Sequence, residues 1–200
     1  MVVRSYEARP ARAEAARIAR PNGWWGMVVF VATEATLFGT IVGTYFYLRF
    51  KVAHWPPAGI PEPEVTAPLI LALVLVSTSL LVQLGFNAAR RERVAATRRL
   101  LLVAMVVQSG YLAMQINLFL GDLHKFGPQQ HAYGSIYFLM LGAHHAHVFV
   151  GILLEAFLFL RLLGGLTNYR LVGLQSTTFY WHFVNVLALV ILATQLSAAV

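Results

Sequence analysis

The residues of this sequence best suited to chemistry are ionisable side chains that lie inside long apolar runs. Glu34 lies in the first run, His144, His145 and His147 lie in the fourth, and His182 lies in the fifth. If these runs cross a bilayer, a charge at the centre costs at least about 2.5–3.5 kcal/mol. Such groups are therefore expected to face protein, water or a ligand.

Glu34 has a functional and a structural interpretation. It lies roughly 15 Å from the near edge of its run at 1.5 Å per residue, where a low dielectric favours the neutral carboxylic acid. As a functional group it would exchange protons or contact lipid. As a structural group it would be hydrogen-bonded to a neighbouring helix. The residues that would permit close helix approach here are small: Gly26, Thr33, Gly39, Thr40 and Gly43.

The histidines also allow two interpretations. His144 and His147 share a helix face, and His147 and His182 lie roughly 9 and 12 Å from the same membrane boundary. A histidine pair at matched depth could ligate a haem or a metal ion. The alternative is a hydrogen-bonded lock between helices that also includes Asn185. The bulky side chains next to His182 favour the lock, because a haem needs small residues around it.

The remaining polar residues indicate structure rather than catalysis. Glu155 lies on nearly the same helix face as His144, and we expect it to form a structural ion pair with Arg161 or with the cluster near Arg90. The sequence has no P-loop, no dinucleotide-binding glycine pattern and no HExxH motif. It has no cysteine, which excludes thiolate ligands and disulfides. We therefore expect neither catalytic nor metal-binding residues in this chain.

The elements that position these residues follow from composition. Of the 200 residues, 58% are hydrophobic and only 12% are charged, and the mean hydropathy is +0.67. This composition excludes a soluble globule and a disordered chain. The formal charge of +7 does not indicate a nucleic-acid partner, because the arginines are grouped between apolar runs. The fold class is therefore all-α membrane protein, with five expected transmembrane helices: Trp24–Leu48, Ala67–Ala88, Leu100–Leu120, Tyr133–Leu160 and Leu174–Leu196.

Loop charges predict the orientation. Twelve of the 15 Lys and Arg residues lie in the N-terminal tail, the second-to-third connection and the fourth-to-fifth connection. The positive-inside rule then places the N-terminus in the cytoplasm and the C-terminus outside the cell. We predict a basic cytoplasmic tail over residues 1–22, an amphipathic helix or a mobile segment, and a membrane domain over residues 23–198. The expected location is the inner (plasma) membrane, with multiple spans.

Five segments, in order, resemble motifs of cytochrome c oxidase subunit III. Residues 26–34 (GMVVFVATE) resemble its "GM-x-x-F-I-x-S-E" helix, and residues 53–60 (AHWPPAGI), with His54 and Trp55, resemble its outer loop. Residues 77–79 (STS) match a serine-rich stretch. Residues 133–135 (YGS) and 142–151 (GAHHAHVFVG) resemble its "YGS…TG-x-H-G-x-H-V-x-x-G" helix. Residues 180–185 (YWHFVN) resemble "YWHFVD".

The resemblance implies the five-helix form of a non-catalytic subunit of an aerobic respiratory haem–copper oxidase. Such a subunit packs on subunit I in a complex that includes subunit II, binds phospholipid, and leaves haem and copper to its partners. Glu34 matches a buried acid linked to lipid contact, carbodiimide reactivity and proton uptake. His144, His147 and His182 match the family histidines. Two family carboxylates are replaced here by Leu118 and Asn185.

Two alternatives remain open. The same motifs occur in the homologous subunit of quinol oxidases and in a protein associated with nitric oxide reductase. A small membrane cytochrome that uses His147 and His182 as haem ligands is a different class of function.

Overall fold

The structure, a computed structural model, consists of five long helices and describes residues 21–61 and 64–197. The helices are α2 (Asn22–Arg49), α3 (Thr66–Arg90), α4 (Val94–Lys125), α5 (Ala132–Leu163) and α6 (Asn168–Leu196). All five are long and apolar enough to cross a membrane, which confirms the predicted all-α class with five spans. The predicted basic tail lies, for residues 1–20, outside the described part of the chain.

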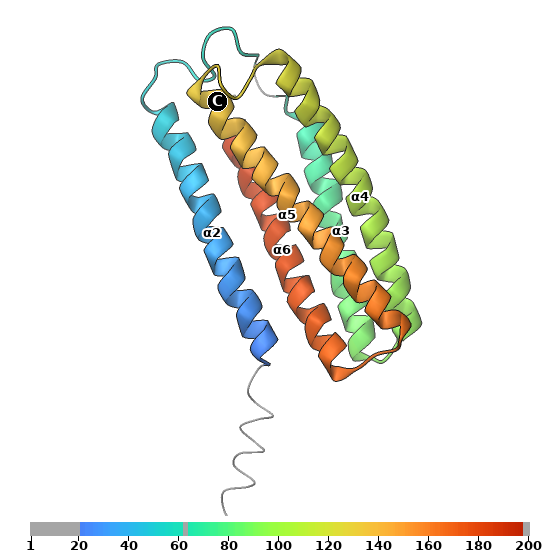
Figure 1. Cartoon of the computed structure of the whole chain (residues 1–200). Helices are drawn as coiled ribbons and strands as arrows, with labels where there is room; N and C mark the ends of the chain where they lie inside the picture. Colours follow the sequence, from blue (N-terminus) through green and yellow to red (C-terminus); the bar gives the residue numbers. More distant parts are fainter. Residues whose placement is uncertain (1–20, 62–63, 198–200) are drawn as a thin grey trace, which may run out of the picture.

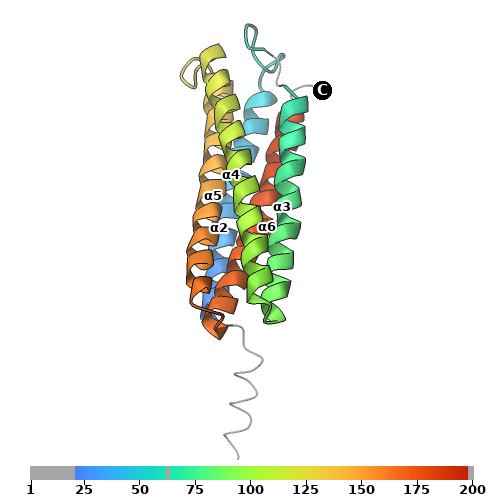
Figure 2. The same ribbon diagram turned by 90° about the vertical axis from the view of Figure 1, so that its right-hand side faces the viewer.

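Helices α3, α4, α5 and α6 form a four-helix bundle, and α2 lies along one edge of it (Figure 1). Within the described chain, α2 contacts α5 and α6 but neither α3 nor α4. Helix α6 contacts α2, α3 and α5 and is the most deeply buried of the five. Figure 2 shows α4 beside α3 on one side and α5 on the other. Helices α5 and α6 are thus the two that connect α2 to the rest of the bundle.

The two ends of the bundle differ in charge. One end, here named the basic end, includes Arg90, Arg91, Arg93, Arg98, Arg99, Arg161 and Arg170. The other, named the long-loop end, carries the connections 50–65 and 126–131. Arg98 closes the basic end, because its guanidinium donates to the carbonyl oxygen of Leu162 at 2.5 and 3.1 Å. This contact ties the start of α4 to the end of α5.

The α5–α6 contact depends on a glycine facing a tryptophan. Trp181 is fully buried, and its indole N–H donates to the Thr78 hydroxyl on α3 at 2.9 Å. A Cβ placed on Gly151 would lie 2.6 Å from Cζ3 of that ring and 3.4 Å from Tyr180. Because the indole is held by its hydrogen bond and by close packing, it cannot move aside.

We expect Gly151→Ala to destabilise the bundle by about 1–3 kcal/mol, the usual cost of an overpacked core. Thermal unfolding of the purified protein should show a midpoint lowered by roughly 2–12 °C, because a protein of this size shifts by about 2–4 °C per kcal/mol. Gly39→Ala is the matched control, because a Cβ there would meet nothing within 4 Å. Equal unfolding midpoints for the two variants would contradict this account of the α5–α6 contact.

Within the described chain, the glycines of α2 do not provide the close helix approach that small residues permit. A Cβ on Gly26, Gly39 or Gly43 would meet no atom within 4 Å, so these glycines face away from the bundle. The buried side of α2 instead presents Phe38, Ile41 and Tyr45. Lipid tails and helix interfaces both accept small apolar residues, so composition alone does not distinguish the two sides.

Candidate functional site

The acid on α2 and a histidine on α5 form a single contact. Oε2 of Glu34 lies 2.9 Å from Nε2 of His147. Their side chains are mostly covered, with exposed fractions of 18% and 15%. The two residues come from helices that are adjacent in space and far apart in the sequence. The structure therefore brings together two residues that the sequence analysis had treated separately.

The protons of this pair follow from its partners. Nδ1 of His147 lies 2.7 Å from the backbone oxygen of Ala143. A carbonyl oxygen only accepts, so Nδ1 carries a hydrogen. One further proton is then needed between Nε2 and the Glu34 carboxyl, because a carboxylate facing a ring lone pair would be repelled. Whichever atom holds that proton, the pair has no net charge. A pair without net charge avoids the energetic cost of a charge inside the membrane.

Aromatic groups hold the pair in place. The ring of Phe38 meets the His147 ring edge-on, with 5.1 Å between centroids. The Tyr180 hydroxyl donates to the backbone oxygen of His147 at 3.0 Å. These contacts leave little freedom for the imidazole. The part of the Glu34 side chain that stays exposed leaves the carboxyl within reach of a small apolar reagent.

The other histidines join different helices. The Nε2 atom of His144 lies 3.5 Å from the Tyr111 hydroxyl on α4. The His182 ring on α6 contacts α3 through Ser79 at 3.1 Å and Gln83 at 3.0 Å. Both ring nitrogens of His147 and both of His182 already have protein partners, so this pair does not fit as axial ligands of one haem. Among the described residues, no group of three or more His, Asp or Glu side chains is placed to hold a metal ion.

Asn185 does not take part in a lock between helices. Its amide nitrogen donates at 2.8 Å to the backbone oxygen of Trp181, one turn earlier in α6. Its side-chain oxygen is buried and has no partner. The expected interhelical role is therefore wrong for this residue. A short side-chain amide that faces its own helix donates to a carbonyl oxygen of that helix rather than to a neighbouring helix.

The expected ion pair between Glu155 and Arg161 does not form. Glu155 is fully buried, and its Oε1 accepts from Nε2 of Gln108 on α4 at 3.0 Å. Arg161 is exposed and lies over the Phe157 ring, with 5.6 Å to the centroid. Six helical residues rotate a side chain by about 600°, so the two residues face different sides of α5. The sequence offered no spacing that would link residue 108 to residue 155.

In the described part of the long connection, residues 50–61 and 64–65, Trp55 packs against two helices. The Trp55 ring meets Tyr45 of α2 and Tyr133 of α5 edge-on, at 5.5 and 5.0 Å between centroids. His54 is exposed beside it. The loop therefore packs across the ends of α2 and α5 at the long-loop end.

Comparison with known proteins identifies the family of this chain. A family model described as cytochrome c oxidase subunit III matches residues 16–196. The chain belongs to this family. Glu34, His147 and Trp181 lie in three of the sequence motifs that resemble subunit III, and the helices that carry those motifs meet around this pair.

Curated relatives agree with the family model. The chain is 29% identical over 168 residues to cytochrome c oxidase subunit 3 of Thermostichus vulcanus, an alignment covering 83% of this chain and 82% of that protein. It is 27% identical over 183 residues to the Bacillus subtilis protein of the same name, covering 90% and 88%. The chain is thus a subunit III of a haem–copper oxidase and a multi-pass membrane protein.

Proposed function

We propose that the chain is a supporting subunit that packs on subunit I of its oxidase, next to subunit II, and carries no redox centre of its own. The observation that supports this role is the neutral Glu34–His147 pair, in which every ring nitrogen is occupied by protein. Such a pair can assist proton uptake or oxygen access in a neighbouring subunit without binding a cofactor itself. The electron donor in this proposal is cytochrome c, in line with the names of the relatives.

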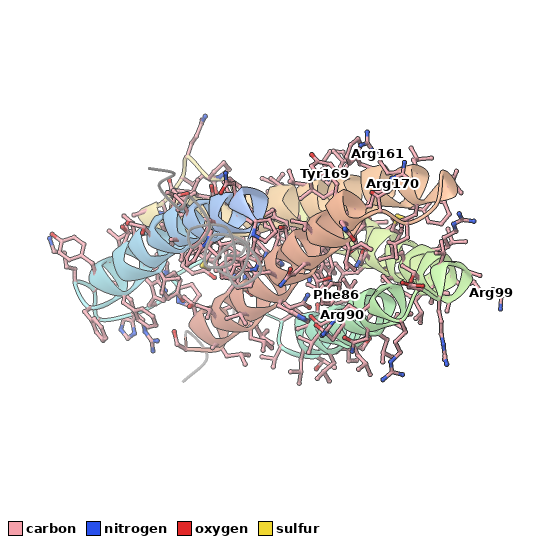
Figure 3. All side chains as sticks on the ribbon, turned by 90° about the horizontal axis from the view of Figure 1, so that it is seen from below. Phe86, Arg90, Arg99, Arg161, Tyr169 and Arg170 are labelled. Atoms are coloured by element: carbon pink, nitrogen blue, oxygen red, sulfur yellow. The ribbon has the colours of Figure 1, made fainter. Side chains whose placement is uncertain are left out.

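A phospholipid site forms part of the same proposal. A recess of about 230 Å³ lies between α2, α5 and α6 near the basic end, and its walls include Met27, Leu154 and Leu158. Arg161 and Arg170 also line it and lie near Tyr169 when the bundle is viewed from below (Figure 3). Apolar walls suit acyl chains, while arginines suit a phosphate group. Glu34 lies two turns above Met27 on α2, close to the path of such a chain.

The proposed orientation places the basic end at the cytoplasmic surface and the C-terminus on the opposite side. Arginines gather at one end of the bundle, as in the cytoplasmic loops of other membrane proteins. In a bacterial cell the membrane concerned is the plasma membrane.

Purification of the respiratory complex tests the supporting role. We expect this chain to co-migrate with the haem- and copper-containing subunits, and phospholipid to co-purify with the complex. The chain expressed alone should show no Soret absorption. Migration apart from haem–copper subunits would overturn the proposal, and a Soret band of the isolated chain that is lost in His182→Ala would establish a membrane cytochrome instead.

A further inference from the structure

A second polar region lies inside the bundle, apart from the Glu34–His147 pair. It is a partly open cavity of about 50 Å³ that lies between α3, α4, α5 and α6. Its polar lining comes from Tyr111, Gln115, His144 and His145, with Asp122 and Tyr137 toward the long-loop end. Helix α2 contributes nothing to this lining, so the cavity is separate from the candidate site described above.

Two of the lining histidines lack partners for a ring nitrogen. His144 and His145 are 3% and 8% exposed. Nδ1 of His144 and Nε2 of His145 are buried and have no hydrogen-bond partner in the protein. Buried polar atoms are almost always paired, either with protein or with ordered water. Both residues line the cavity, which makes it the candidate location for the missing partners.

The cavity has the size and polarity that water requires. One water needs about 10–15 Å³ of such space and two to four polar partners, so 50 Å³ accommodates roughly three waters. The Tyr111 hydroxyl, which accepts from Gln115 at 3.3 Å and lies 3.5 Å from Nε2 of His144, adds a further polar group to the lining. An acyl chain does not suit this lining, because it would leave the ring nitrogens unpaired.

The cavity adjoins a larger recess at the long-loop end. That recess, of about 490 Å³, shares Asp122, Tyr137 and Gln195 with the cavity and is also lined by Glu64 and Lys125. Asp122 stands at the junction, where it accepts from the Tyr137 hydroxyl at 2.6 Å and from Lys125 at 3.0 Å. Charged residues keep this recess hydrated, so water can be supplied from that end.

We propose that the cavity is an internal water site in which a short chain of ordered waters bonds the free nitrogens of His144 and His145 and extends past Asp122 to the long-loop surface. The site hydrates the middle of the α3–α6 bundle from one side of the membrane only. It does not depend on the proposed supporting role in the oxidase.

Radiolytic hydroxyl-radical footprinting of the full chain in its native membrane assembly tests the site. Radicals formed from bound water oxidise neighbouring side chains, and mass spectrometry locates the products. We expect Tyr111, which is 4% exposed, to be oxidised several-fold more than the fully buried Tyr180, which does not line the cavity. Equal oxidation of the two tyrosines would show a dry cavity and overturn the proposal.

Variants identify the water that is responsible. Ala72→Leu places a larger side chain in the lining, and His145→Leu removes a polar partner, so each should lower oxidation of Tyr111 several-fold. Leu73→Val is the control, because Leu73 is 62% exposed on the outside of α3 and should leave the oxidation unchanged. If Ala72→Leu fails to fold, the difference in oxidation between Tyr111 and Tyr180 in the parent protein still shows whether the cavity holds water. Undiminished oxidation in a folded His145→Leu protein would contradict the assignment.

Discussion

Replacing Glu34 with glutamine is expected to abolish labelling of this chain by a hydrophobic carbodiimide. The reagent adds to a carboxyl group that has a proton available, and Glu34 has one through its contact with His147 at 2.9 Å. The Glu34 side chain keeps 18% of its surface exposed, which admits the reagent. Glutamine preserves the shape and can donate its amide hydrogen to the ring, so haem spectra of the complex should not change. Mass spectrometry of the labelled subunit provides the measurement.

A second membrane-embedded acid gives the matched control. Glu155 is fully buried between α4 and α5, so the reagent cannot reach it. Glu155→Gln should therefore leave the labelling at the level of the parent protein. Adduct that persists in Glu34→Gln and disappears in Glu155→Gln would reverse the assignment.

Replacing Gln108 with leucine is expected to destabilise the bundle by about 3 kcal/mol, toward the upper end for a buried polar group that loses its partner. The Glu155 carboxyl is fully buried, and the Gln108 amide is the hydrogen-bond donor it has in the described structure. Replacing both residues, in Gln108→Leu/Glu155→Leu, removes the unpaired group together with its partner. The double variant should therefore be more stable than Gln108→Leu alone.

Thermal unfolding of the parent protein, Gln108→Leu, Glu155→Leu and the double variant measures the interaction energy between the two residues. If the stability lost in the double variant equals the sum of the losses in the two single variants, the residues do not interact. Leu102→Ala on the lipid-exposed face of α4 is a control for general effects of substitution, because Leu102 is 48% exposed. It should change the unfolding midpoint little.

The five spans were predictable because helix length and hydropathy are local properties of the sequence. Contacts between helices were not. Glu34 contacts His147 because α2 packs against α5. Glu155 contacts Gln108 because α4 also packs against α5. Arg161, although near Glu155 in sequence, faces elsewhere on the same helix. The glycines of α2 were misassigned, because a lipid-facing surface and a packed one select the same small residues.

The position of α2 in the chain means that Glu34 is synthesised well before the residue it contacts. Helix α2 is synthesised before α5 and α6, the two helices that it contacts in the described structure, and His147 follows Glu34 by 113 residues. At ribosomal rates of about 5–20 residues per second, His147 is synthesised on the order of ten seconds after Glu34. During that interval the nascent chain holds an unmatched carboxyl in or near the translocon. A factor that shelters a helix before its partner helices are synthesised would therefore act on α2 during this interval.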